Sequence, residues 1–561
     1  MIIYTFSCCF VFLPVFCSLF KLSFSFNIIY LIVCLSSDIV FVYNKQDQFS
    51  HPHLFLLLRM ELSSLLHHLH LSSSPSSGKP RPSPPLPPIT ELLSWLQKKL
   101  IIAADKPSES SSLIGQVEQV FQAADPDWLF SLASDDQDSR WAELQEAYSS
   151  VIGALIGCAA LPLCEDDCSS LNTAAYQSVP SQAVAVSSAL TALLGHWDGG
   201  GGAKGMTSSC GSADRSGVFL LQDQAWTSAA SRTAARRLNG ALLRAGSWTD
   251  SAHLLMGDGE NRGILGGVLD LLQPQLTKDS WQRCEAVKLV FGWTLLQVTR
   301  PFLSPHLPRL LPPSLLLNDH YKPENCMLGV RCLHHIVLNT PAADLRQFNT
   351  AEVLYQALFK HLYTSEAAVI QVTRTHTHKP PISLSPASSR RKSCHHDDVL
   401  GLVLTHMEVE HKVVLRRVYA SALPLYVERM GVAVCRHLRR VERVVLGYLE
   451  VRDPPEETSR LKILEALQGT TRGAWPRMAC RVDPLLRCLL RLLVDVSSDS
   501  SLDDSVRQQL MAQSSASIQL LDACSHGRVQ VSHLVSEHFL FRRLGQSNSN
   551  RKQLKVDFRP M

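Results

Sequence analysis

Apolar residues recur along this chain at spacings of three and four, which is the period of an amphipathic α-helix. The pattern is clearest from Asp279 to Gln371, where it predicts three successive helices and no strand. The first of these helices carries five apolar side chains and a threonine on one face: Val287, Val290, Phe291, Thr294, Leu295 and Val298. The loops between the helices are short, so each apolar face has a neighbouring helix to pack against.

Polar residues and prolines mark the ends of the next two helices. Pro323 suits a first helical turn, where its missing N–H costs nothing. That helix must end before Pro341, because a proline pushes the preceding Thr340 out of the α region. Asn349 is predicted to cap the third helix, and Glu352 three residues later completes a capping box.

The same period continues on both sides of this stretch. Thr90 is predicted to cap a first helix, and Gly246 to end another as its C′ residue. Pro424 is expected to break or kink a helix, whereas Asp483 and Pro484 are placed as the N-cap and first residue of a later one. Between these prolines runs a long apolar stripe, formed by Val434, Leu438, Val441, Val445 and Leu449.

Helix pairs recur about every 35–45 residues, which is the spacing of HEAT-type repeats. Helices with wide apolar faces must stack in series, and this favours an all-α fold, an α-solenoid of HEAT-like helical repeats with disordered linkers. The chain then divides into an apolar leader (1–59), a Ser/Pro-rich linker (60–89), an N-terminal helical region (90–198), a Gly/Ser-rich loop (199–222), central HEAT-like repeats (223–371), a disordered insertion (372–395), C-terminal HEAT-like repeats (396–530) and a polar tail (531–561).

Two segments depart from the helical pattern. Residues 1–43 are almost uncharged and suit a signal sequence or a membrane span. We interpret residues 1–59 instead as an artefact of the gene model, because Met60 opens a stretch that resembles a native start. Residues 372–393 contain three prolines, which forbid a long helix, and an alternating Thr-His run of the kind that a translated CA repeat encodes. We hypothesise that an intron was retained there and a helix-coding exon omitted.

Bulk composition excludes little. The 561 residues are 45% apolar and 19% charged, with a net charge of +4. So small a net charge gives no case for nucleic-acid binding. Sixteen cysteines are spread along the chain. Several fall at stripe positions and are expected to be small buried thiols in a reducing compartment: Cys284, Cys326, Cys332 and Cys488.

Few residues suggest catalysis or ligand binding. Cys394, His395, His396 and Asp397 have the residue types of a metal site, but their spacing matches no tetrahedral pattern. The GGGGAKG run at 199–205 lacks the spacing of a phosphate loop, and no strand precedes it. We therefore expect no catalytic residue, no bound metal and no cofactor.

Four arginines form a predicted basic face opposite the apolar stripe of 434–449: Arg436, Arg439, Arg440 and Arg443. They are the candidate partner-binding residues. A solvated face, an acidic protein partner and nucleic acid are the alternatives, and Glu442 dilutes the positive charge. Leu438→Asp is expected to place an unpaired charge in the core, whereas Arg440→Glu is expected to leave folding nearly intact.

Long runs of sequence carry a family resemblance. They are FGWTLLQVTRPFLSPHLPRLLPPSL, NCMLGVRCLHHIVLNTPAADLRQFN, LTHMEVEHKVVLRRVYASALPLYVERMGV, CRHLRRVERVVLGYLEVRDPPEETSRLKILEAL, AWPRMACR and LLDACSHGRV. Together they resemble the second Tel-two-interacting protein family, the smallest subunit of the Triple-T (TTT) co-chaperone complex. The resemblance extends from about Trp226 to Val529 and is interrupted between Gln371 and Cys394.

The resemblance implies a non-enzymatic scaffold located in the cytoplasm and nucleus. Its implied partners are Tel-two and the large HEAT-repeat Tel-two-interacting subunit. The ninety-kilodalton heat-shock chaperone and PI3-kinase-like kinases would be engaged indirectly, which links the chain to DNA-damage and nutrient signalling. No direct contact with nucleic acid is expected, and none with a membrane if residues 1–59 are an artefact. Two alternatives are a membrane-anchored helical protein, built on residues 1–43, and a karyopherin-like HEAT transport adaptor, which shares the architecture.

Overall fold

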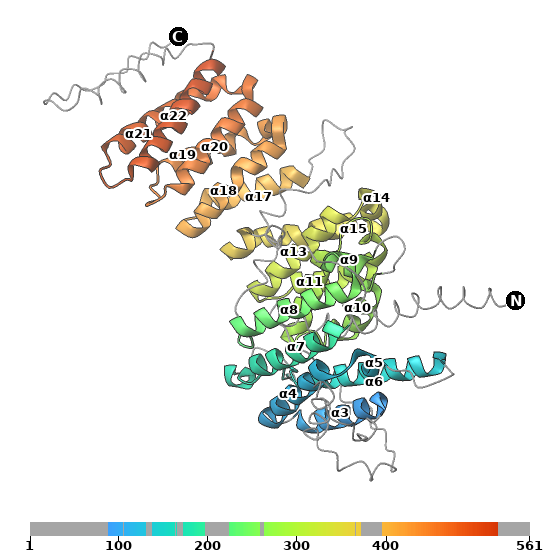
Figure 1. Cartoon of the computed structure of the whole chain (residues 1–561). Helices are drawn as coiled ribbons and strands as arrows, with labels where there is room; N and C mark the ends of the chain where they lie inside the picture. The colour runs from blue at the N-terminus through green and yellow to red at the C-terminus, as the bar shows by residue number, and fades with distance from the viewer. Residues whose placement is uncertain are drawn as a thin grey trace. The chain divides into compact units, whose positions relative to one another are not determined.

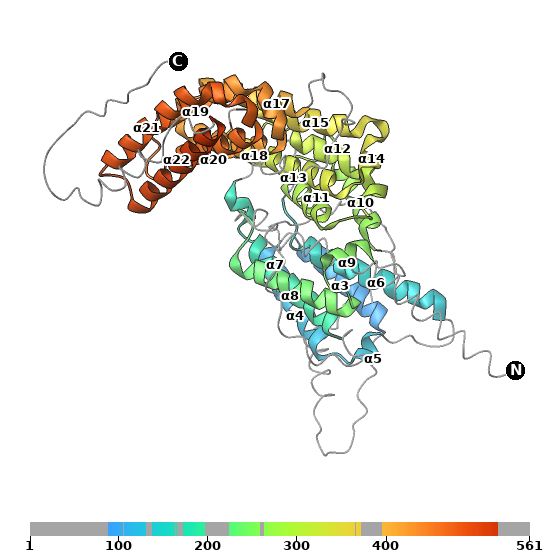
Figure 2. The ribbon, with the colours of Figure 1, turned by 90° about the horizontal axis from the view of Figure 1, so that it is seen from above.

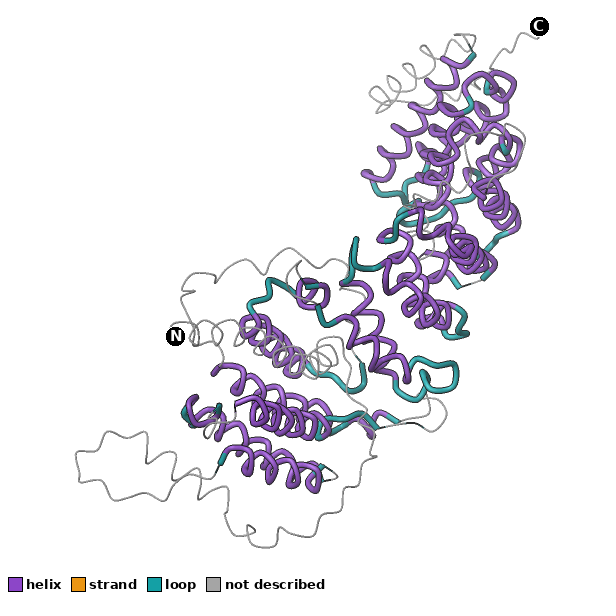
Figure 3. Tube along the Cα trace, turned by 90° about the vertical axis from the view of Figure 1, so that its right-hand side faces the viewer, coloured by secondary structure: helices purple, strands orange, loops and turns teal. Residues whose placement is uncertain are grey.

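The computed structural model describes residues 88–525, except for 105, 131–136, 163, 165–171, 197–223, 258–262, 365 and 372–394. The described residues contain helices, turns and loops but no β-strand, as Figure 3 shows, so the predicted all-α class is confirmed. The predictions for residues 1–59, 199–222, 372–394 and 531–561 lie outside the described residues, as does nearly all of the linker 60–89.

The chain divides into two compact units, Met1–Leu317 and Asn318–Met561. This division falls inside the central region 223–371 that the sequence treats as one. The α-helices of the first unit are α3 (Ile89–Ala103), α4 (Pro107–Ala123), α5 (Pro126–Leu129), α6 (Gln137–Gly157), α7 (Val179–Gly195), α8 (Ala229–Gly246), α9 (Ser251–Met256), α10 (Leu265–Leu272), α11 (Glu285–Gln297) and α12 (Leu307–Asn318), which ends on the first residue of the second unit (Figure 1).

Short 3-10 helices extend or join the helices of the first unit: η2 (Thr173–Tyr176), η5 (Gln273–Gln275) and η6 (Ser304–His306). Within this unit α3 packs against α4 and α6, while α7 packs against α4 and α8. Consecutive helix pairs therefore lie side by side, as in a solenoid.

The second unit contains α13 (Pro323–Asn339), α14 (Ala342–Arg346), α15 (Thr350–Phe359), α17 (His395–Val409), α18 (Val413–Met430), α19 (Leu438–Leu449), α20 (Thr458–Gly473), α21 (Val482–Ser498) and α22 (Asp504–Cys524). Its 3-10 helices are η7 (Gln347–Asn349), η8 (Lys360–Tyr363), η9 (Gly431–Arg436), η10 (Trp475–Arg477) and η11 (Ala479–Arg481).

Two layers of helices run through the last three pairs of this unit. The helices α17, α19 and α21 contact one another in series, and α18, α20 and α22 form a second series beside them (Figure 2). Each helix also packs on its sequence neighbour, so every pair buries its apolar face against the next pair. This is the α-solenoid arrangement that the periodicity predicts.

The apolar stripe of 434–449 forms part of the core of the second unit. Val434, Leu438, Val441, Val445 and Leu449 are all buried there, together with residues of α17, α18, α20 and α21. Each such side chain contributes on the order of 1.5–3 kcal/mol when it is fully buried. The stripe is interrupted locally, because η9 carries its first residue and α19 begins only at Leu438.

Some predicted helix ends are confirmed and others are wrong. Pro323 lies in the first turn of α13, and Thr340 is extended before Pro341, as expected. Asn349 precedes α15, but its φ of 59° is left-handed and its side chain makes no capping hydrogen bond. Glu352 instead accepts a hydrogen bond from Gln356 at 2.7 Å, so the capping box does not form.

Two ends in the first unit also differ. Pro88, not Thr90, occupies the N-cap position of α3. Gly246 is the last residue of α8, and Ser247 takes the left-handed conformation with φ of 58°. The glycine is required for a different reason, because a Cβ at position 246 would lie 1.9 Å from the ring of Trp248. Close approach of an indole, rather than backbone conformation, explains this glycine.

Proline has less effect in the second unit than expected. Pro424 is buried within α18, which continues from Val413 to Met430 without a break. The burial of this helix in the core offsets the lost backbone hydrogen bond. Pro484 falls in the first turn of α21, but this helix begins at Val482, so Arg481 replaces Asp483 as the N-cap residue.

Candidate interaction surface

The four candidate arginines lie in the connection between α18 and α19 and in the first half of α19. Arg436 ends η9, and the other three lie on the first two turns of α19. Their side of α19 is opposite the buried stripe, as predicted. The structure nevertheless divides the four into three ion-paired arginines and one that has no partner among the described residues: Arg436, Arg440 and Arg443 are paired, and Arg439 is not.

Arg436 is held by an acid from the previous repeat. Its Nη1 donates to Oδ2 of Asp397 at 2.5 Å, and Nε2 of His437 lies 2.9 Å from Oδ1 of the same carboxylate. Asp397 is only 7% exposed. The bond thus joins the first turn of α17 to the turn before α19 and contributes to the packing of two repeats.

Arg440 and Arg443 share a second acid on α17. Both donate to Glu408, at 3.2 and 3.0 Å, and Arg440 also donates to the carbonyl of Gly401 at 3.0 Å and to Oγ1 of Thr405 at 2.7 Å. Burial by itself raises the pKa of Glu408, but the hydrogen bonds and charges of the two arginines outweigh it and lower this pKa. The guanidinium of Arg440 therefore joins α19 to α17 and is not free to bind a partner protein.

The ion pairs continue along one layer. His395 lies 3.2 Å from Glu352 one repeat earlier, and Arg481 lies 2.5 Å from Glu442. The sequence separations of these two pairs are 43 and 39 residues, and that of Arg436 and Asp397 is 39. Each separation equals one repeat, so a base of one repeat contacts an acid of the preceding repeat. The sequence contains this signal, since acids recur at the repeat period, but only the packing shows which base each acid meets.

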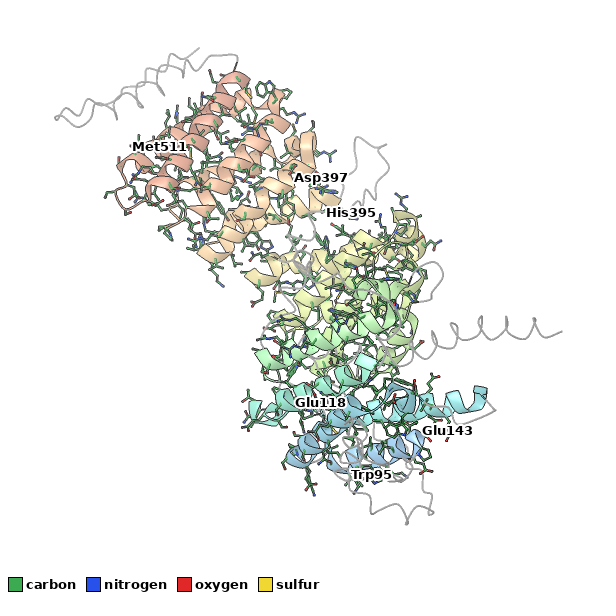
Figure 4. All side chains as sticks on the ribbon, viewed as in Figure 1. Trp95, Glu118, Glu143, His395, Asp397 and Met511 are labelled. Atoms are coloured by element: carbon green, nitrogen blue, oxygen red, sulfur yellow. The ribbon has the colours of Figure 1, made fainter. Side chains whose placement is uncertain are left out.

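The cluster that has the residue types of a metal site, but not its spacing, makes other contacts in the fold. His395, His396 and Asp397 form the first turn of α17 rather than a loop, so the predicted insertion ends one residue too late. Figure 4 shows His395 and Asp397 at this end of α17. His395 contacts Glu352 and Asp397 contacts Arg436. Among the described residues, no group of three His, Cys, Asp or Glu side chains is placed to hold a metal ion, and Cys394 lies outside them.

The sequence did not predict a buried hydrogen-bonded network around His361. Its Nε2 lies 2.7 Å from Oδ1 of Asn318, its Nδ1 lies 3.4 Å from Sγ of Cys326, and Nδ2 of Asn318 donates to the carbonyl of Ala357 at 3.2 Å. A histidine that contacts a cysteine through one ring nitrogen and an asparagine through the other resembles a thiol-protease triad. This network differs from such a triad in the protonation of its side chains and in their access to solvent.

Burial keeps both members of this pair neutral. Desolvation, followed by the charge of Lys360, lowers the pKa of His361 to about 4. Desolvation raises the pKa of Cys326 to about 11. A catalytic cysteine needs a thiolate beside an imidazolium on an accessible surface. Here both side chains are buried, so the network joins Asn318, the first residue of the second unit, to α13 and η8 as a structural element.

The cysteines at stripe positions are buried and free, as predicted. Cys284, Cys326, Cys332 and Cys488 are each unbonded to another cysteine, and burial raises the pKa of every one of these thiols. Small apolar side chains of this kind fill gaps in a helical core.

One described stretch, Thr173–Gly195, is long and apolar enough to cross a membrane by length and composition alone. Half of that window is buried in the fold, and core helices pass the same test, so it carries little weight. The alternative of a membrane anchor was based on residues 1–43, which lie outside the described residues.

Comparison with known proteins supports the sequence resemblance. The chain is 47% identical to TELO2-interacting protein 2 of Homo sapiens over 319 residues, covering 55% of this chain and 62% of the human protein. It is 46% identical to TELO2-interacting protein 2 of Mus musculus over 318 residues, covering 55% of this chain and 61% of the mouse protein. The matched stretch spans less than two thirds of these relatives' length, and no protein-family model matches the chain.

Among solved structures, the karyopherin Kap121p is similar with a TM-score of 0.40 at 12% identity, covering 94% of this chain and 52% of Kap121p. An engineered protein gives a TM-score of 0.34 at 12% identity, covering 77% of this chain and 99% of its own length. Similarity at this level carries no argument about function. The identity to TELO2-interacting protein 2 is far higher and extends over more than 300 residues, so the resemblance seen in the sequence is confirmed: over this stretch the chain is similar to TELO2-interacting protein 2.

Proposed function

We propose that this chain is a non-enzymatic scaffold subunit of a Triple-T complex, acting with the ninety-kilodalton heat-shock chaperone in the maturation and stability of PI3-kinase-like kinases. Its partners are Tel-two and the large HEAT-repeat Tel-two-interacting subunit, and it works in the cytoplasm and nucleus. The observation that carries the proposal is the identity of 45–47% to proteins named for interaction with TELO2.

The architecture supports a role in presenting side chains to partner proteins rather than in catalysis. Stacked helix pairs hold side chains at fixed positions along an extended face, and partner proteins dock on such faces through a few anchors and a polar rim. The network of Cys326, His361 and Asn318 has the residue types of a catalytic triad, but it is buried and neutral. A scaffold needs binding surfaces and a frame of packed helices, and the stacked helix pairs of each unit supply such a frame.

The karyopherin-like alternative has weaker support. The TM-score to Kap121p is 0.40 at 12% identity, whereas the relatives named for TELO2 interaction are 45–47% identical. Shared helical-repeat architecture does not carry over a transport function.

Affinity purification from cells tests the proposal. The tagged full chain is expected to recover Tel-two and the large subunit in stoichiometric amounts. Depletion is expected to lower the abundance of PI3-kinase-like kinases without lowering their messages. Recovery of nuclear pore components without Tel-two, or unchanged kinase levels after complete depletion, would reject this function.

A further inference from the structure

One edge of the second unit carries both exposed apolar side chains and unpaired arginines. It lies where α18 turns into α19 and where α20 turns into α21, and we call it the η9–η10 edge. Its members are Val432, Arg439, Arg472, Trp475 and Arg477.

Packing brings the two turns together. A Cβ at Gly473 would lie 2.9 Å from the carbonyl oxygen of Gly431 and 3.3 Å from Val434, so the end of α20 is in tight contact with η9. Val432 follows Gly431 directly, and Trp475 lies two residues beyond Gly473. The ion pair of Arg481 with Glu442 holds η11, which follows η10, against α19.

The arginines of this edge have no partner within the fold. The guanidinium groups of Arg439, Arg472 and Arg477 are exposed and make no ion pair or hydrogen bond with any described residue. Other arginines of the second unit are paired, among them Arg440 with Glu408 at 3.2 Å on α19 and Arg417 with Asp453 at 2.6 Å on α18. Three guanidinium groups without a partner among the described residues therefore lie in the two turns of this edge.

Exposed apolar side chains belong to the same two turns, and Trp475 lies between Arg472 and Arg477 in sequence. Val432 is 77% exposed and Trp475 is 40% exposed. Tryptophan and arginine are the residue types most enriched among those that dominate binding energy at protein interfaces, where an aromatic ring fills a pocket and arginines pair with carboxylates. Two turns that carry an exposed indole and three guanidinium groups without a partner among the described residues therefore have the composition of a docking site.

We propose that the η9–η10 edge is a docking surface for an acidic segment of a partner protein, one that also carries an apolar side chain to cover Trp475 and Val432. Resting on the proposed function, this assigns the edge to a subunit of the Tel-two assembly. It also narrows the basic face predicted from the sequence, because Arg439 alone of those four arginines is left unpaired within the described part of the chain.

Charge and chemistry favour a protein over a nucleic acid. A nucleic-acid surface needs a run of cations that follows the phosphates and a net basic domain. The repeats that form this edge, residues 395–525, carry 17 Lys and Arg side chains against 17 Asp and Glu side chains, and Glu428 and Asp483 are exposed at the same edge. Short carboxylate-bearing segments suit three separated guanidinium groups better than a continuous polyphosphate chain does.

Two charge-matched double variants test the surface. The edge variant is Arg439→Glu with Arg477→Glu. The control is Lys412→Glu with Arg491→Glu, which reverses two exposed charges away from this edge, at the start of α18 and in the second half of α21. Both variants are first checked for unchanged urea midpoints, since all four side chains are exposed.

Binding is measured against the purified complex of Tel-two and the large subunit, and separately against a fluorescein-labelled peptide of glutamates with one leucine. The edge variant is expected to lose about tenfold or more in affinity for both, and the control to lose less than about threefold. Trp475→Ala is expected to weaken binding with little change in its salt dependence. A single-stranded RNA 20-mer is the comparison ligand.

The outcomes separate the two proposals. If the wild-type chain fails to bind the Tel-two complex, the proposed function is rejected. The affinity for the peptide then tests whether the η9–η10 edge is a docking surface. Equal affinities of the edge and control variants for the complex overturn the docking inference. If the wild type does not bind the complex, equal affinities of the two variants for the peptide overturn it. RNA binding that is tighter than peptide binding and is lost in the edge variant overturns it too.

Discussion

Nη1 of Arg436 donates to Oδ2 of Asp397 at 2.5 Å across 39 residues of sequence, which is one helical repeat. The buried carboxylate also faces His437 at 2.9 Å. The same relationship recurs between Glu442 and Arg481. Polar contacts between repeats therefore help to fix the register with which one helix pair packs on the next.

Asp397→Asn is expected to lower the free energy of unfolding by about 1–3 kcal/mol, because it removes the charge that Arg436 and His437 face at a buried site. Urea unfolding of the full chain measures this as a lower midpoint at an unchanged slope. Asp495→Asn on the exposed side of α21 is the control and should leave the midpoint in place. Equal midpoints for the two variants would show that the pair does not stabilise the stacking.

Leu438→Asp and Arg439→Glu test neighbouring positions of opposite exposure. Leu438 is buried, so an aspartate there places an unpaired charge in the core and costs several kcal/mol. Arg439 is exposed and unpaired among the described residues, so its reversal should hardly change the melting temperature. Similar melting temperatures for the wild type and Leu438→Asp would contradict the core assignment.

The sequence alone predicts that Arg440→Glu leaves folding nearly intact, and the structure changes this prediction. A reversal on a solvated face would leave folding intact, but Arg440 donates to Gly401, Thr405 and Glu408. The variant loses these bonds and sets two carboxylates together, so we expect a loss of about 1–2 kcal/mol in the free energy of unfolding. The comparison is again Arg439→Glu, one residue away. Indistinguishable stabilities for the two would mean that the contacts of Arg440 contribute nothing.

The pH dependence of stability follows from His361. Its pKa is lowered to about 4 from an ordinary value of 6.5, so between these values the unfolded chain binds a proton that the folded chain does not. Stability from this group is fully present above pH 6.5 and is lost as the pH falls towards 4. The wild type should therefore lose more stability between about pH 7 and about pH 5 than His361→Gln does. Parallel losses in the two proteins would refute this role.

Thiol reactivity distinguishes buried from exposed cysteines. Iodoacetamide should label Cys480, which is exposed, in the native protein. It should label Cys326 only after unfolding, because this thiol is buried and desolvation raises its pKa to about 11. Peptide mass spectrometry reports the two sites separately. Rapid native labelling of Cys326 would contradict the buried, neutral network.

Local rules predicted what depends on nearby sequence. The limits of α13 follow from Pro323 and Pro341, and the buried stripe of 434–449 follows from its period. The rules failed where tertiary packing decides. Pro424 remains inside a helix that the core holds in place, and Gly246 is required by the ring of Trp248 rather than by its own backbone.

The candidate surface was predicted only in part for the same reason. Periodicity placed Arg440 and Arg443 on the polar side of α19, which is correct, whereas Arg436 ends η9 before that helix begins. It did not predict that Asp397 and Glu408, one repeat earlier, pair with them. Pairing between repeats depends on how two helices stack, and a single sequence does not specify the facing residues. Trp475 was missed because it belongs to no helical stripe.

Size-exclusion chromatography with light scattering tests the central claim most directly. The purified chain is mixed at micromolar concentration with the purified complex of Tel-two and the large Tel-two-interacting subunit. Our account predicts one peak whose mass equals the sum of the three chains, at one copy each. Separate elution of this chain from that complex, with the chain shown to be folded by circular dichroism, would contradict it.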